Sequence, residues 1–137
     1  MDYTIIAVDF DGTLCFSNWP ELGEPNRPLI EYLQAQQRSG NKLILWTCRA
    51  GEALEKAVAW CKDQNLTFDA VNDNLPEVIE MYGNNSRKIT CDYYIDDKAV
   101  LPAMVFFAST NYLKMQRHFP KVAVGNSSKL HKLSGAC

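Results

Sequence analysis

The sequence predicts an α/β fold built on a central parallel sheet. Short continuous apolar runs, such as Ile5–Val8 and residues 42–46, suit strands that are buried on both faces. Segments with helical periodicity separate these runs, and such alternation is typical of a parallel sheet. The length of 137 residues, with 47% hydrophobic and 22% charged residues, suits one soluble globular domain.

The first predicted strand, Ile5–Val8, ends in the sequence Asp9-Phe10-Asp11-Gly12-Thr13. An extended backbone would point both carboxylates the same way and turn the phenyl ring into the core. Gly12 allows a tight backbone, and Thr13 can hydrogen-bond locally to hold it. Two like charges so close suggest a divalent metal, a nucleophilic carboxylate and an acid/base carboxylate. A solvated Asp-Gly turn is the alternative.

The polar, Pro-rich stretch Cys15–Arg27 is predicted to be an irregular loop. It would hang beside the two aspartates as a flap. Phe16 and Trp19 could shape a substrate mouth there or pack on the edge of the core.

A helix is predicted to start at Pro28, with Asn26 or Arg27 near its cap, and to stop at Gly40. The second strand, residues 42–46, follows. A right-handed crossover through this helix makes the first two strands a parallel pair.

The second strand delivers Thr47-Cys48-Arg49 beside the tip of the first. Thr47 can donate to an anionic oxygen, although a threonine there is often only a turn residue. Arg49 could bind a substrate oxygen or cap a surface. Cys48 is expected to be an inert thiol that contributes to the substrate-binding loop, since both histidines lie far away in the sequence.

The next elements are predicted to be a helix over 51–64, a short strand over 68–71 and a helix over 76–82. A polar tip, residues 72–74, follows the short strand. A fourth buried strand then ends in Asp96 and Asp97, which would add metal ligands beside Asp9 and Asp11. Lys88, before that strand, could neutralise a nucleophile and a phosphate, or be a solvated surface charge.

Residues 98–137 are harder to interpret. A helix turn and short strand could lie within 99–108 and a helix within 111–119. Residues 1–97 carry 8 basic and 16 acidic residues, whereas residues 98–137 carry 6 basic residues and no acid. A basic end can bind anions or nucleic acid, or be a solvated tail. The expected organisation is one domain over 1–124 and a flexible basic tail over 125–137.

Five cysteines at irregular spacing predict reduced thiols in a cytoplasmic protein. No signal peptide is expected, and the longest late apolar run is too short to cross a bilayer.

Four motifs in order resemble those of the haloacid dehalogenase superfamily of phosphohydrolases. They are DFDGTL (residues 9–14), LILWT (43–47), Lys88 and YYIDD (93–97), and the resemblance covers residues 3 to about 100. It implies a three-layer Rossmann-like fold with helices on both faces of the sheet. The short gaps between motifs resemble a member without a cap domain, whose open site suits bulky or polymeric phosphorylated substrates. Nucleic acid would bind only as a substrate. Formation of a homo-oligomer is an open alternative.

The resemblance implies a magnesium-dependent phosphatase. Asp9 would form an aspartyl-phosphate, and Asp11 would act as acid and base. Thr47 and Lys88 would stabilise phosphoryl oxygens. Asp9, the Asp11 backbone carbonyl, Asp96 and Asp97 would hold Mg²⁺.

Two other readings remain. The first is a phosphate- or partner-binding module without turnover. The second is a receiver-type signalling domain, which is disfavoured because its phosphorylated aspartate normally lies on a later strand than its acidic pair.

Overall fold

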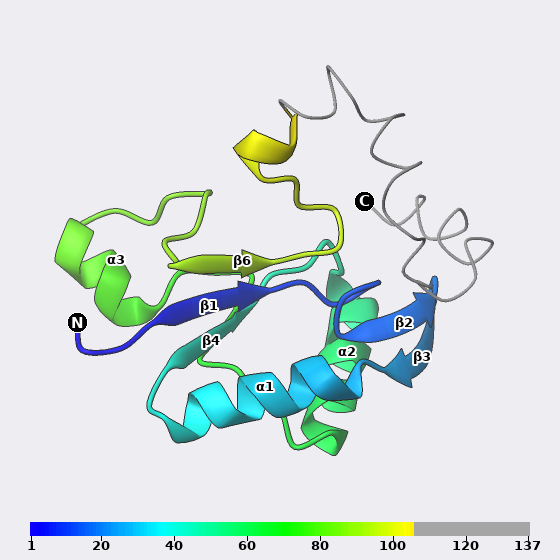
Figure 1. Ribbon diagram of the computed structural model, residues 1–137. Coiled ribbons are helices and arrows are strands. Elements are labelled where there is room, and N and C mark those ends of the chain that lie inside the picture. Colours follow the sequence, from blue (N-terminus) through cyan, green and yellow to red (C-terminus); the bar gives the residue numbers. More distant parts are fainter. Residues whose placement is uncertain (106–137) are drawn as a thin grey trace.

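The computed structural model describes residues 1–105, and its centre is a parallel sheet of four strands (Figure 1). The strand order is β5-β4-β1-β6, and every neighbouring pair is parallel. The strands are β1 (Ile5–Val8), β4 (Lys42–Leu45), β5 (Ala70–Val71) and β6 (Tyr93–Ile95). The helices are α1 (Arg27–Arg38), α2 (Gly51–Asp63) and α3 (Pro76–Tyr82). This arrangement confirms the predicted α/β fold with a parallel sheet.

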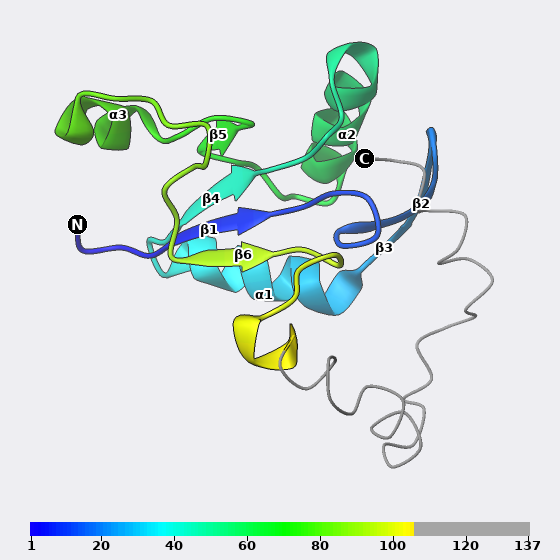
Figure 2. The same cartoon turned by 90° about the horizontal axis from the view of Figure 1, so that it is seen from above.

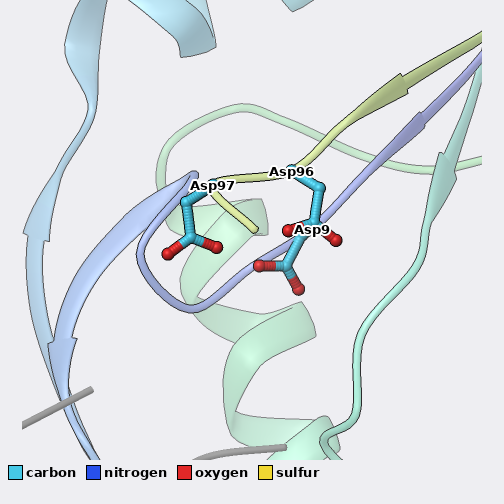
Figure 3. A group of neighbouring side chains, drawn as sticks. All are labelled: Asp9, Asp96 and Asp97. Atoms are coloured by element: carbon cyan, nitrogen blue, oxygen red, sulfur yellow. The ribbon is translucent and has the colours of Figure 1, made fainter. Parts of the chain in front are cut away.

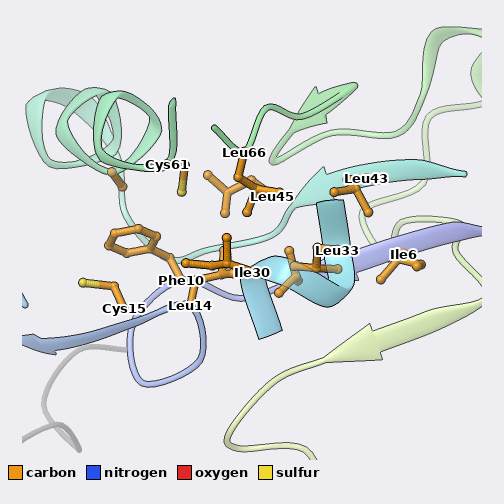
Figure 4. Packing of buried hydrophobic residues seen from close by; sticks show 12 residues of the cluster. Ile6, Phe10, Leu14, Cys15, Ile30, Leu33, Leu43, Leu45, Cys61 and Leu66 are labelled. Carbon is orange, nitrogen blue, oxygen red and sulfur yellow. The ribbon is translucent and has the colours of Figure 1, made fainter. Parts of the chain in front are cut away.

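Helices cover both faces of this sheet because β1 sends alternate side chains to opposite sides. Ile6 and Val8 belong to one core cluster with residues of α1 and α2, part of which Figure 4 shows. Ile5 and Ala7 belong to a second cluster with Val78 of α3. In Figure 2, α1 runs behind β1 and β6. Burial on both faces explains why β1 reads as a continuous apolar run.

The helix ends follow their local sequence signals. Asn26 is the N-cap of α1, and Pro28 lies in its first turn, so the predicted start is correct to within one residue. Gly40 follows α1 with φ +87°, and Gly83 follows α3 with φ +62°. Glycine adopts such left-handed conformations without a Cβ penalty. The helix predicted over 76–82 has these bounds, and α2 ends one residue before its predicted end.

The stretch expected to be an irregular flap is instead a β-hairpin. It consists of β2 (Cys15–Asn18) and β3 (Glu21–Pro25), paired antiparallel, and its turn contains a cis Trp19-Pro20 peptide. Cys15 and Ser17 are buried while Phe16 is 53% exposed, which is the alternation of a half-buried strand. The prediction failed because four residues of alternation are a weak signal beside two prolines.

Two strand predictions also need correction. β6 was expected to be buried, but it lies at an edge of the described sheet, where only β1 pairs with it. Tyr93 is therefore 59% exposed, and Tyr94 is exposed as well. The strand predicted over 42–46 ends one residue earlier, at Leu45. The strand predicted over 68–71 begins two residues later, at Ala70.

Within the described part of the chain, residues 102–105 form a helical turn. The predicted helix at 111–119, the domain end at 124 and the basic tail over 125–137 lie outside the described residues. Within residues 1–105, no helix is long and apolar enough to span a bilayer.

Candidate active site

Three carboxylates meet where β1 and β6 end (Figure 3). Asp9 directly follows β1, and Asp96 and Asp97 directly follow β6. Val8 pairs with Ile95, and the Asp9 amide donates to the Ile95 carbonyl at 2.9 Å, so the two strand ends are level. One carboxylate oxygen from each of the three lies within 4.8 Å of the others. We call Asp9, Asp96 and Asp97 the acidic cluster.

Thr13 joins the two sides of the acidic cluster. Its hydroxyl lies 3.2 Å from Asp9 Oδ2 and 3.5 Å from Asp97 Oδ1, and it accepts from the Asp97 amide at 3.0 Å. The chain can pass this close only at Gly12, which has φ +78° and where a Cβ would lie 2.4 Å from Asp97 Oδ2. The predicted tight turn at Gly12, held by Thr13, is confirmed.

Burial and the crowding of negative charge change the acidity of Asp9 and Asp97. The pKa of Asp9 is raised from 3.8 to about 7, chiefly by burial and then by the charges of Asp96 and Asp97. The pKa of Asp97 is also raised, first by burial and then by Asp96. A bound cation would favour the ionised forms. Carboxylate oxygens are the ligands that Mg²⁺ prefers, so this donor set fits that ion.

Asp11 does not share this arrangement. Its carboxylate binds the Arg49 guanidinium with both oxygens, from Nε to Oδ2 at 2.8 Å and from Nη2 to Oδ1 at 2.7 Å. The expectation that Asp11 and Asp9 extend along one strand is wrong because β1 ends at Val8 and a turn follows. The amides of Leu14 and Cys15 donate to the Phe10 carbonyl in that turn. The predicted burial of Phe10 is confirmed.

Arg49 is buried, with 2% of its surface exposed. Arg49 therefore does not cap a surface, and the role expected for it at a substrate oxygen stays a prediction. Its guanidinium stacks on the Phe10 and Trp19 rings, with Cζ 5.0 and 4.7 Å from the ring centroids. Trp19, which is 43% exposed, thus packs on Arg49 at the edge of the core, and its part in a substrate mouth stays a prediction.

Thr47 lies in the loop after β4, at the same edge of the sheet as Asp9. The amide of Thr47 donates to Asn72 Oδ1 at 2.8 Å, and its hydroxyl accepts from the Arg49 amide at 3.1 Å. The hydroxyl hydrogen of Thr47 can therefore still point to an anion. Cys48, in the same loop, is exposed. Cys15, Cys61 and Cys91 are free thiols.

Lys88 is exposed, and its carbonyl accepts from the Ser86 hydroxyl. Within residues 1–105, no hydrogen bond or ion pair joins its amine to the acidic cluster. Burial raises the pKa of the Cys91 thiol, and the charge of Lys88 opposes part of that rise. The role expected for Lys88 at the phosphate stays a prediction.

A solved structure of a conserved protein from Bacteroides thetaiotaomicron is similar to this chain, with a TM-score of 0.64 and 32% sequence identity. The likeness covers 92% of this chain and 100% of the Bacteroides chain. This chain belongs to the family of that Bacteroides protein. No family model and no curated protein matches the sequence. The Bacteroides relative is a conserved protein, and the family relationship supports the fold and assigns no activity.

Sequence reasoning missed one residue of the site, Asn72, and one contact, the pairing of Asp11 with Arg49. Asn72 holds the Thr47 amide with its side-chain oxygen and donates to the Arg49 carbonyl at 3.3 Å. The polar tip that contains Asn72 was predicted, but no role was predicted for this residue. The pairing of Asp11 with Arg49 gave no sequence signal, because it depends on the direction of a turn.

Proposed function

We propose that this chain is a magnesium-dependent phosphatase with a haloacid dehalogenase-like fold and no cap domain. It hydrolyses a phosphate monoester through an aspartyl-phosphate on Asp9. The observation that carries the proposal is the acidic cluster, in which a half-buried carboxylate with a raised pKa stands beside two exposed ones at the carboxyl end of the sheet. Open parallel sheets bind ligands at this edge.

The proposed reaction assigns a separate step to each aspartate of the DFD motif. Asp9 attacks phosphorus in line, and the bond to the leaving oxygen breaks. Asp11 protonates that oxygen and then takes a proton from the water that releases phosphate. The Thr47 hydroxyl and the backbone amides after it bind phosphoryl oxygens.

Asp9, Asp96 and Asp97 would hold the magnesium ion, with the Asp11 carbonyl as the fourth protein ligand implied by the family resemblance. The ion would supply positive charge that offsets the repulsion between phosphate and nucleophile. The described residues support three of these ligands directly, since their oxygens already converge.

Release of phosphate from an aryl phosphate tests the proposal. We expect turnover that requires magnesium and is almost abolished in Asp9→Asn, because the amide cannot attack phosphorus. Asp63→Asn is the matched control, since Asp63 is an exposed aspartate at the end of α2. Equal activity in Asp9→Asn and wild type would refute the mechanism.

A second candidate function is binding of a phosphorylated partner without turnover. The engagement of Asp11 by Arg49 favours it, because a carboxylate held at both oxygens is not placed to protonate a leaving group. 5′- and 3′-phosphorylated oligonucleotides, which suit an open site, separate the two functions. Tight binding with no phosphate release from these or the aryl ester would identify a binding module.

A further inference from the structure

Arg49 is the most deeply buried charged side chain near the site, and its contacts join several elements. Asp11, in the turn after β1, accepts two hydrogen bonds from its guanidinium. The carbonyl of Pro20, at the tip of the hairpin, accepts a third at 3.3 Å. Arg49 itself lies just after β4. One planar group therefore connects the turn after β1, the hairpin and the end of β4.

The hairpin contact is reinforced by stacking. Trp19 lies on the guanidinium at 4.7 Å from Cζ, and Phe10 of the core lies at 5.0 Å. Cation–π contacts strengthen when the cation is shielded from water, as it is here. A buried guanidinium is also costly to leave unpaired, so Asp11, Arg49 and Trp19 hold one another in place.

We propose that Arg49 is a positioning residue that ties the Asp11 carboxylate to the tip of the hairpin, so that the acid/base group takes its position from the hairpin. The catalytic part of this inference rests on the proposed function. Each Asp11 oxygen accepts one hydrogen bond from Arg49 and keeps a second lone pair, so Arg49 sets the direction in which the carboxylate faces. Trp19 stacks on the same guanidinium and shifts with it.

The coupling can be measured without turnover by ¹⁹F NMR of protein labelled with 5-fluorotryptophan. The sequence has three tryptophans, Trp19, Trp46 and Trp60, whose resonances are assigned with Trp→Phe variants. We expect Asp11→Asn to move the Trp19 resonance, because the ion pair that fixes the guanidinium is lost. We expect Arg49→Lys to move the Trp19 resonance too, since the lysine ammonium cannot bind both Asp11 oxygens in parallel or stack as a planar group. The Trp46 resonance is the internal reference.

Glu52→Gln is the matched control for charge. It removes one carboxylate from an exposed pair with Lys56 on α2, and we expect the Trp19 resonance to stay in place. A Trp19 resonance that is unchanged in both Asp11→Asn and Arg49→Lys overturns the coupling.

A kinetic test uses Trp19→Ala, which removes a partly exposed ring and leaves the Asp11–Arg49 pair present. A nitrophenolate leaves with little help, whereas an alkoxide needs a proton from Asp11. We expect kcat to fall by about tenfold more with an alkyl phosphate than with 4-nitrophenyl phosphate, with similar KM changes. Phe16→Ala, which removes an exposed ring of the same hairpin, is expected to affect both esters alike. Equal losses in Trp19→Ala overturn the positioning role.

The two arms separate this inference from the proposed function. A wild-type protein that hydrolyses neither ester refutes the phosphatase, and the ¹⁹F shifts then decide on their own whether Arg49 ties Asp11 to the hairpin.

Discussion

The ionised Asp9 carboxylate is repelled by its acidic neighbours unless a cation is present. Burial disfavours the negative charge of Asp9, and so do two further carboxylates whose oxygens lie within 4.8 Å of its own. The same three oxygens form a ready set of ligands for a hard divalent ion. Stability of the metal-free protein should therefore depend on pH in a direction opposite to that of an ordinary salt-bridged aspartate.

The sign follows from the raised pKa of Asp9, which is about 7 in the folded protein against 3.8 ordinarily. Between these values the folded protein keeps the proton and the unfolded chain releases it, so the free energy of unfolding falls as pH rises. Below this window both states are protonated, and above it both are ionised. We predict that metal-free wild type loses stability relative to Asp9→Asn as pH rises through this window.

Thermal unfolding of both proteins with and without magnesium, at several pH values, measures this effect. Magnesium should raise the Tm of wild type above neutral pH and leave Asp9→Asn almost unchanged, because ligands that bind the folded state stabilise it. A constant difference between the two proteins across the window would show that Asp9 does not titrate as described.

The sequence predicted the acidic cluster because each member directly follows a strand, and strand ends are a local feature. It did not predict the partner of Asp11. The direction of that side chain depends on the turn at Phe10 and on an arginine 38 positions away. Lys88 illustrates the same limit, since its expected position at the phosphate needs a loop path that no local pattern specifies.

At the scale of elements, the hairpin is the part of the chain that brings Trp19 to the site. Its two strands are held closely at Gly23, where a Cβ would lie 2.0 Å from the Phe16 carbonyl oxygen. The Gly23 amide also donates to Cys15 Sγ at 3.2 Å. A methyl group at this position cannot be accommodated without moving backbone.

We predict that Gly23→Ala lowers the free energy of unfolding by about 1–3 kcal/mol, the usual cost of overpacking. Glu24→Ala, at the exposed neighbouring position, should stay within about 0.5 kcal/mol of wild type. Urea denaturation measures both. Equal stability of Gly23→Ala and wild type would mean that the strands do not pair as closely as described.

Sequence patterns predicted helices better than strands in this chain. Capping residues and glycines gave the bounds of α3 and the limits of α1 to within one or two residues. The hairpin was missed because β2 has only four residues of alternation. β6 was expected to be buried because its sequence is apolar, yet its place at the edge of the described sheet depends on how the strands assemble.

At the scale of the whole molecule, the strand order places the acidic cluster. The chain goes from β1 outward to β4 and β5 on one side and then returns to β6 on the other. The loops after β1 and β6 therefore leave the sheet at a switch point, where open α/β sheets bind ligands. A parallel sheet with helices on both faces thus brings residues 87 positions apart, Asp9 and Asp96, to one edge.

The central claim is that Asp9 becomes phosphorylated, and trapping this intermediate tests it most directly. Wild-type protein is mixed with magnesium and an aryl phosphate, quenched in acid and reduced with borohydride, which converts an aspartyl-phosphate to homoserine. Mass spectrometry of the peptides then locates the change. Homoserine at position 9, dependent on substrate and magnesium, is the predicted result. Turnover with an unmodified Asp9, or modification of another aspartate instead, would contradict the mechanism.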